Sequence, residues 1–171
     1  IDGLWFDKNE AVQCTITPND GVVDGAATPS NLVVISNSPP AAISVTLAPL
    51  TPFTNQSVLA PVTGWSDDDG DAENYLWART VNGFIVAGAT TDTLSSSDFV
   101  KGDSIQVTAT PDDGTDIGIP VVSAATVAQN SLPIITSVSL TPVSPDITST
   151  LTCTPNGVSD TDLDVVTFTY E

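Results

Sequence analysis

Residues 99–118 read FVKGDSIQVTATPDDGTDIG, and residues 6–25 read FDKNEAVQCTITPNDGVVDG. The two stretches align without a gap at a spacing of 93 residues, from Phe6 to Phe99. Each alternates apolar and polar residues and then reaches a turn rich in Pro, Asp and Gly, which is typical of a half-buried strand that ends in a tight turn. Self-similarity at a fixed spacing indicates a repeat architecture.

The same spacing holds further along the chain. SVTLAPLTP at 44–52 is matched by SVSLTPVSP at 137–145, and SDDDGD at 66–71 is matched by SDTDLD at 159–164. These stretches differ in composition from the first pair and from each other. One register across all of them therefore predicts a period of 93 residues.

Two short linkers, SNSPPA at 36–41 and NSLPI at 130–134, separate the repeats. Proline stiffens the backbone, so consecutive repeats are expected to lie end to end as a semi-rigid rod. We predict three domains: residues 1–38 as the C-terminal half of one repeat, 39–131 as a complete repeat, and 132–171 as the N-terminal half of a third.

Within each repeat, apolar residues recur at every second position. The segments 43–47, 105–109 and 12–16 all alternate in this way. The pattern predicts short strands with one buried face, and it assigns to the core Ile43, Val45, Leu47, Ile105, Val107, Ala109, Val12, Cys14 and Ile16. With turn signals between the strands, the sequence predicts an all-β fold of tandem antiparallel β-sandwiches.

The composition limits the classes of function. Twenty-one acidic residues face three basic ones, giving a net charge of −18 at pH 7. Phosphate binding relies on Lys and Arg, so we expect no nucleic-acid partner. His is absent and neither Cys has a neighbouring base, so we expect no enzymatic activity. Apolar runs stay well short of the roughly twenty residues of a membrane-spanning helix, so we predict no transmembrane segment.

Three segments resemble strands of an immunoglobulin-like domain: LTCT at 151–154, YLW at 75–77 and VQCTIT at 12–17. The chain is similar to the tandem immunoglobulin-like and cadherin-like repeats of large prokaryotic surface proteins and adhesins, in its SD-D-GD elements and its GATTDTL stretch (88–94). The resemblance implies immunoglobulin-like sandwiches, an extracellular or cell-surface location, and a core pin on the second, third and sixth strands. In the complete repeat, this pin would consist of Ala60, Trp77 and Val107.

The two cysteines correspond to pin positions that hold other residues in the complete repeat. Cys153 corresponds to Ala60, and Cys14 corresponds to Val107, at the 93-residue spacing. Either further repeats of the same chain supply a partner for each Cys, or Cys153 of one subunit forms a disulfide with Cys14 of the next. Two free buried thiols are the third possibility. A bridge within one chain would fold the rod back on itself, so we do not expect it.

Two acidic loops are candidate cation sites. Aspartates alternate at 67–71 and again at 160–164, and the resemblance places the acidic turn 112–116 at the same pole as the first loop. Ca²⁺ takes six to eight oxygen ligands, and carboxylates this dense repel one another without a cation. The candidate ligands are Asp67, Asp69, Asp71, Asp113, Asp116, Asp160, Asp162 and Asp164. The alternative is a solvated turn without an ion, because Asp, Asn and Gly are common turn residues.

Two functions fit this sequence. The first is a structural extracellular protein that forms a rod or filament of tandem domains, by split-domain complementation between copies of itself or by further repeats of the same chain. The second is a spacer or ligand-binding segment of a cell-surface adhesin. A half-repeat at each end favours the first, and an adhesin tip would be expected to carry an inserted, aromatic-rich loop. Lys8 and Lys101 also recur one repeat apart, where a crosslink to a nearby Asn or Asp is conceivable.

Overall fold

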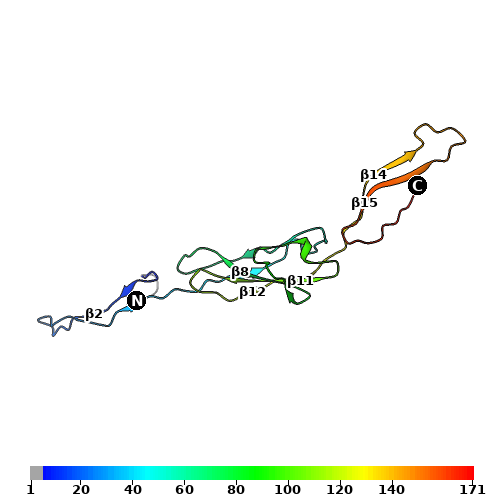
Figure 1. Ribbon diagram of the computed structural model, residues 1–171. Helices are drawn as coiled ribbons and strands as arrows, with labels where there is room; N and C mark the ends of the chain where they lie inside the picture. The colour runs from blue at the N-terminus through cyan, green and yellow to red at the C-terminus, as the bar shows by residue number, and fades with distance from the viewer. Residues whose placement is uncertain (1–5) are drawn as a thin grey trace. The chain divides into compact units, whose positions relative to one another are not determined.

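The computed structural model describes residues 6–171, so the first five residues of the predicted domain 1–38 lie outside it. The described chain is nearly all-β, as predicted, and contains no α-helix between residues 6 and 171 (Figure 1). One turn of 3₁₀-helix, η2, spans Ser96–Asp98. Most strands are two residues long, which reflects the density of Pro, Gly and Asp turn residues between them.

Contacts between residues divide the chain into two compact units. The first contains residues 6–44, Val62–Leu76 and Ala109–Val121, and the second contains Val45–Pro61, Trp77–Thr108 and Val122–Glu171. This division does not coincide with the predicted boundaries near residues 38 and 131. Those three repeats therefore stay a prediction.

The first segment forms a ladder of four short strands. They are β1 (Ala11–Val12), β2 (Thr15–Ile16), β3 (Thr28–Pro29) and β4 (Val33–Val34). Strand β1 pairs antiparallel with β4, and β2 pairs antiparallel with β3. None of these eight residues is buried, so this ladder leaves its apolar residues uncovered.

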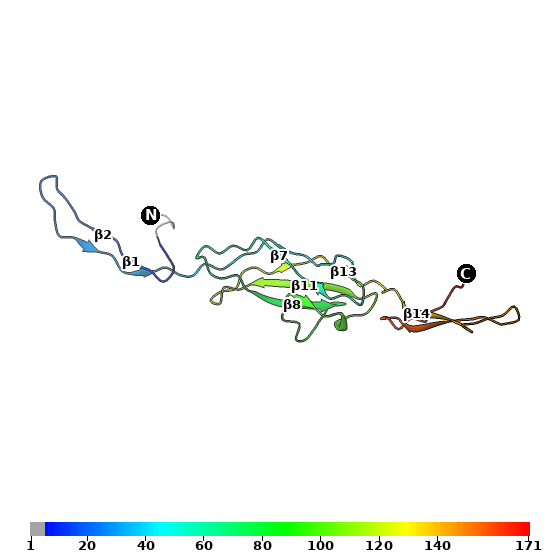
Figure 2. The same cartoon turned by 90° about the horizontal axis from the view of Figure 1, so that it is seen from above.

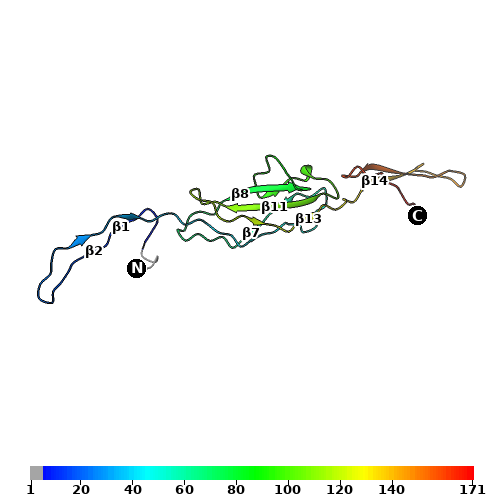
Figure 3. The same ribbon diagram turned by 90° about the horizontal axis from the view of Figure 1, so that it is seen from below.

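The middle of the chain holds most of the strands. They are β5 (Ser44–Val45), β6 (Val58–Leu59), β7 (Val62–Thr63), β8 (Tyr75–Val81), β9 (Phe84–Ile85), β10 (Thr93–Leu94), β11 (Ser104–Pro111), β12 (Val121–Val122) and β13 (Thr126–Val127). The long strands β8 and β11 lie side by side (Figures 2 and 3). They belong to a five-stranded sheet in the order β12-β11-β8-β9, with β13 also paired to β11. Strand β10 pairs with β6, and β5 pairs with β7.

The last two strands form an antiparallel hairpin. Strand β14 (Ile134–Thr141) pairs with β15 (Thr152–Ser159) from Ile134–Ser159 to Thr141–Thr152 (Figure 1). Gly157 is required in this ladder, because a Cβ there would lie 2.4 Å from Oγ1 of Thr136. All of β14 is exposed, and so is most of β15.

Strand β11 confirms the predicted alternation. Its residues alternate between half-buried and buried along the whole strand, and Ile105, Val107 and Ala109 are its buried apolar residues. In the second unit, the buried apolar residues are Val45, Leu47, Val58, Ala60, Leu94, Phe99, Ile105, Val107 and Ala128. They form a small core of aliphatic side chains with one aromatic ring.

Three predicted core residues are exposed, and a fourth is only half-buried. Ile43 is 80% exposed, because its side chain lies over Gly64, where the missing Cβ leaves room, instead of joining Val45. Cys14 is exposed and Ile16 is 68% exposed, and Val12 is only half-buried. The alternation of 12–16 is correct as a strand pattern, but no second layer among the described residues covers these side chains.

Truncation of Ile105 to alanine should destabilise the second unit strongly. Ile105 is almost fully buried, and removing three carbons from a core site typically costs about 2–5 kcal/mol. Phe84→Ala is the matched control, because Phe84 is 78% exposed and its loss should change stability by less than about 0.5 kcal/mol. Urea unfolding followed by tryptophan fluorescence measures both. Equal effects of the two substitutions would contradict the core described above.

Candidate metal centres

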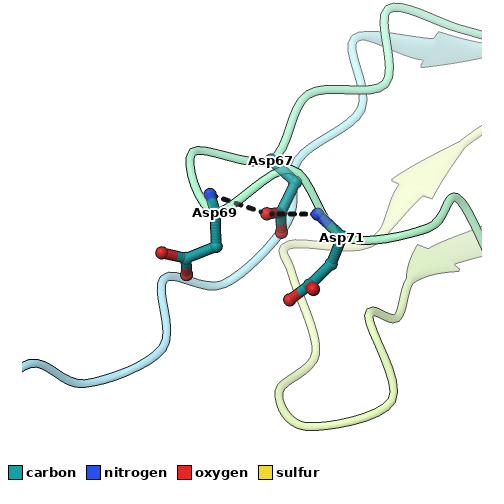
Figure 4. A group of neighbouring side chains, drawn as sticks. All are labelled: Asp67, Asp69 and Asp71. Atoms are coloured by element: carbon teal, nitrogen blue, oxygen red, sulfur yellow. Dashed lines mark hydrogen bonds between the residues drawn. The ribbon is translucent and has the colours of Figure 1, made fainter. Parts of the chain in front are cut away.

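The loop that follows β7 folds around the carboxylate of Asp67. Its Oδ1 accepts hydrogen bonds from the backbone N–H groups of Asp69 (2.9 Å) and Asp71 (3.1 Å), as Figure 4 shows. Gly70 lies between them with φ +75°, a left-handed conformation that glycine adopts without steric cost. The side chain of one aspartate therefore determines the path of the backbone that carries the other two.

The three carboxylates are brought close together. Each of Asp67, Asp69 and Asp71 offers an oxygen within 4.8 Å of the other two, and all three residues are half-buried. Asp67 Oδ2 is fully buried, and no hydrogen-bond donor among the described residues reaches it. A buried carboxylate oxygen without a partner is costly, so this atom marks a place where a ligand would be stabilising.

Groups from two other segments bind the remaining carboxylates of the loop. The backbone N–H of Ser38, in the first linker, donates to Asp69 Oδ2 at 2.6 Å. Lys8 Nζ forms an ion pair with Asp71 Oδ2 and also donates to Asn37 Oδ1 at 3.3 Å. The turn at Lys8, the linker and the acidic loop are thereby joined by polar contacts, although they are far apart in the sequence. We call this set of residues the first clamp.

The predicted ligands Asp113 and Asp116 lie beside the first clamp but outside the triplet. Asn37 Nδ2 donates to Oδ2 of Asp113 at 2.8 Å and to Oδ2 of Asp116 at 3.0 Å. The same amide group accepts from Lys8 through its oxygen. Asn37 therefore separates these two carboxylates from the ammonium, and the structure gives them an amide partner instead of a shared position with Asp67.

A second set of contacts has the same pattern, and we call it the second clamp. Asp160 Oδ1 accepts from the N–H groups of Asp162 (2.8 Å) and Asp164 (3.2 Å), and Ser131 N–H donates to Asp162 Oδ2 at 2.6 Å. Lys101 Nζ forms an ion pair with Asp164 and donates to Asn130 Oδ1 at 3.3 Å. Each of these residues follows its counterpart in the first clamp by 93 positions. The three carboxylates again offer oxygens within 4.8 Å of one another.

The second clamp differs from the first in two details. Leu163 replaces Gly70 and keeps the left-handed conformation, with φ +60°, which is strained for a leucine. The hydroxyl of Thr54 is an extra partner, since it hydrogen-bonds Asp162 Oδ1 and lies 2.7 Å from the hydroxyl of Ser131. Thr54 and Ser131 are both buried, so this polar pair is satisfied within the protein.

Both lysines are held in the charged form. Hydrogen bonding to Asp71 raises the pKa of Lys8 above its ordinary value, and the charges of Asp71, Asp69 and Asp113 add to the effect, against some desolvation. Hydrogen bonding to Asp164 raises the pKa of Lys101 in the same way, with help from the charges of Asp164, Asp162 and Asp160. The hydrogen bond from Asn37 lowers the pKa of Asp113.

Each clamp thus gathers three carboxylates around a single ammonium group. The Ca²⁺–oxygen distance is about 2.3–2.6 Å, so two oxygens on one ion lie at most about 5 Å apart. The oxygens of both triplets meet that condition. Hard anionic oxygens without nitrogen or sulfur ligands suit Ca²⁺ or Mg²⁺ better than a transition metal.

The three residues of the predicted core pin differ in burial, and the pin itself stays a prediction. Ala60 and Val107 are each 1% exposed, whereas Trp77 is half-buried. The guanidinium of Arg79 lies 5.5 Å from the centre of the Trp77 ring, and its Nη1 donates to the carbonyl of Ala89 at 3.1 Å. The two cysteines are free and exposed.

Sequence reasoning missed Arg79 as a buried residue. It lies two and four positions after Trp77 and Tyr75 in β8, so period-two counting would have placed it on the same face. It is 1% exposed, and burial lowers its pKa against the opposing charge of Asp92. The reasoning also left the partners of Lys8 and Lys101 open. Each lysine pairs with an aspartate 63 residues later, Asp71 or Asp164, and the 93-residue period does not determine that pairing.

Comparison with known proteins adds no family. A scan against models of protein families finds no match to this sequence, and a search of curated proteins finds none either. Within residues 6–171, no helix has the length and apolar character needed to cross a membrane.

Replacing Lys8 or Lys101 by methionine should lower the melting temperature at neutral pH. Because the folded-state pKa of each lysine is raised, the ion pair stabilises fully below the ordinary lysine pKa and is lost as the pH rises through the higher folded value. The gap in melting temperature between wild type and variant should therefore close as the pH rises above the ordinary lysine pKa of about 10.4 and through the higher folded-state pKa.

The controls for this test are Lys8→Arg and Lys101→Arg, which keep the positive charge. They should retain most of the wild-type melting temperature, as measured by circular dichroism across the pH series. A gap for the methionine variants that stays constant across the alkaline part of the pH series would assign the effect to packing of the lysine stem, not to its charge.

Proposed function

We propose that this chain is a structural extracellular protein that forms a rod or filament of tandem immunoglobulin-like β-sandwiches with a period of 93 residues. The nearly all-β structure supports the sandwich class. The extracellular location rests on the resemblance to prokaryotic surface repeats and on the acidic composition. The chain acts by assembly and not by catalysis, in keeping with a sequence that lacks histidine.

One observation carries this proposal: the two clamps use the same contacts at a spacing of 93 residues. In each, a lysine pairs with the third aspartate, an asparagine accepts from the lysine, and a serine N–H binds the second aspartate. The lysine and the linker belong to one predicted repeat, and the acidic loop belongs to the next. A contact set that recurs at each predicted boundary is what a rod needs, because it fixes the orientation of one repeat on the next.

We further propose that each acidic triplet binds Ca²⁺. Asp67, Asp69 and Asp71 would hold one ion, and Asp160, Asp162 and Asp164 would hold the other. A single lysine neutralises only one of the three carboxylate charges, and the bound ion would neutralise the others. The ion would also give the buried Asp67 Oδ2 a partner. The role of the ion is structural: it would stiffen the boundary between repeats.

Calcium should raise the melting temperature of the chain. A ligand at one hundred times its dissociation constant stabilises the folded state by about 2.7 kcal/mol. The test is thermal unfolding in millimolar Ca²⁺ and in EGTA, for wild type and for the double variant Asp67→Asn, Asp160→Asn. The variant should lose the calcium-dependent shift.

Asp68→Asn is the matched control for the calcium test. Asp68 is exposed and next to Asp67 but contributes no oxygen to the triplet, so it should keep the full shift. If wild type, the double variant and the control all melt at the same temperature with and without Ca²⁺, the loops are solvated turns and the calcium proposal is wrong.

The rod itself is tested by small-angle X-ray scattering on the monomeric fraction. When the contacts of both clamps are formed, the pair-distance distribution should be that of a stiff, extended particle. The double variant Lys8→Ala, Lys101→Ala should broaden it and shorten the mean end-to-end distance, because each boundary loses its ion pair. Identical scattering curves for wild type and variant would show that the clamps are not the source of stiffness. The proposal of a rod would then lose its main evidence.

A further inference from the structure

The hairpin β14–β15 presents an apolar face that no described residue covers. Val138 and Leu140 lie on one face of β14, and Leu140 is directly opposite Cys153 in β15. Val138 is 61% exposed, Leu140 is 55% exposed, and Cys153 is exposed. A two-stranded hairpin of this kind is only marginally stable in water unless a second layer packs on it.

The complete repeat shows what normally lies on this face. At the 93-residue spacing, Val138, Leu140, Leu151 and Cys153 correspond to Val45, Leu47, Val58 and Ala60, and each of those is at most 5% exposed. They belong to the core of the second unit together with Ile105, Val107 and Phe99. The same strand pattern is therefore buried in one repeat and uncovered in the other.

The residues that complete the core have uncovered counterparts at the other end of the sequence. Ile105 corresponds to Val12, Val107 to Cys14, and Ala109 to Ile16. Val12 is half-buried, and Cys14 and Ile16 are exposed in the ladder β1–β4. The described residues thus include counterparts of both halves of a sandwich core, and neither half is covered by other described residues.

We infer that the ladder β1–β4 of a second copy of this chain packs on the hairpin β14–β15 and completes an immunoglobulin-like core. This inference rests on the proposed function and names the partner of the rod. The two surfaces differ, so the contact is head-to-tail and each added copy leaves a new hairpin uncovered. Such a heterologous contact propagates into an open filament instead of closing into a dimer.

In this arrangement, a clamp also lies at each end of the completed domain. The hairpin enters that domain from the second clamp, through Ser131 and Asp162. The ladder leaves it through the first clamp of the next copy, where Lys8 binds Asp71. Each boundary along the filament then has the same lysine, asparagine, serine and aspartates, and the clamp pattern continues from one subunit to the next.

The two segments contain no counterpart of residues 79–93, which hold the end of β8 and strand β9. In the complete repeat β9 ends the sheet order β12-β11-β8-β9, so it is an edge strand. Its two residues, Phe84 and Ile85, are both exposed. The core formed by Val45, Leu47, Ile105 and Val107 includes neither of them, so the completed domain retains these apolar core positions, whereas the buried Arg79 has no counterpart in it.

Completion brings Cys14 of one copy and Cys153 of the other into the same core. Their counterparts, Val107 and Ala60, are each 1% exposed in the complete repeat. A small disulfide such as oxidised glutathione can link the two thiols. The protein disulfide forms as the reagent's S–S bond breaks, and the reagent leaves as two thiols that carry both protons and both electrons. The result is a covalent bond between successive subunits.

The test uses the single variants Cys14→Ser and Cys153→Ser with oxidised glutathione as the oxidant. Wild type should give a ladder of covalent oligomers on a non-reducing gel, which collapses to one band with reductant. Each variant alone should stay monomeric on that gel, and an equal mixture of the two should stop at a covalent dimer. Mass spectrometry of a ¹⁴N/¹⁵N mixture should identify a Cys14–Cys153 peptide that joins differently labelled chains.

A second measurement follows association without the thiols. In the variant lacking both cysteines, Leu140→Asp should abolish concentration-dependent sedimentation, because it places a charge on the apolar face. Ser139→Asp is the matched control on the opposite face of β14, since its counterpart Thr46 is exposed in the complete repeat. It should sediment like the parent.

Three outcomes would overturn the inference: a chain that remains monomeric at every concentration, symmetric Cys14–Cys14 or Cys153–Cys153 links in place of the mixed pair, or equal effects of the two aspartate substitutions. If the chain stays monomeric but keeps its calcium-dependent shift in melting temperature and the scattering curve of a stiff particle, only the inference of a second copy is overturned. Loss of those properties with intact crosslinking would overturn the clamps and leave the complementation in place.

Discussion

The carboxylate of Asp67, together with that of Asp160 one repeat later, is the group on which the polar architecture depends. Each of these carboxylates accepts hydrogen bonds from two backbone N–H groups and thereby shapes its loop. Once the loop has this shape, the second aspartate meets a linker N–H and the third meets a lysine. Aspartate side chains therefore organise the boundary between predicted repeats. The geometry of that boundary depends on the charge of these carboxylates.

That dependence has an electrostatic cost. Three carboxylates close to one ammonium leave each clamp with excess negative charge, in a chain whose net charge is already −18. If the triplets bind Ca²⁺ as proposed, the contact between repeats would respond to the ions in the surrounding medium, so the proposed structural role and the proposed cation dependence share one physical origin.

Sequence reasoning predicted the local alternation of buried and exposed residues, but it missed features that depend on contacts between distant segments. Alternation in 105–109 gave the buried face of β11 correctly, since a period of two is a local property of strands. It failed at Ile43, which turns over Gly64, and at Cys14 and Ile16, where the pattern requires a second layer that the described chain does not supply. Arg79 was missed because a charged residue is rarely expected in a core. The triplets were visible as spacing, but their lysine and serine partners come from distant segments.

All three basic side chains of the sequence are committed to internal contacts. Lys8 and Lys101 are in ion pairs, and Arg79 is buried beside Trp77. The rest of the described surface has only acidic groups among its charged residues, so two copies that approach through it repel each other. At physiological ionic strength that repulsion decays over about 8 Å, and in fresh water it reaches several times further. If the chain forms filaments as proposed, the distance between neighbouring filaments would then depend on the ionic strength of the medium.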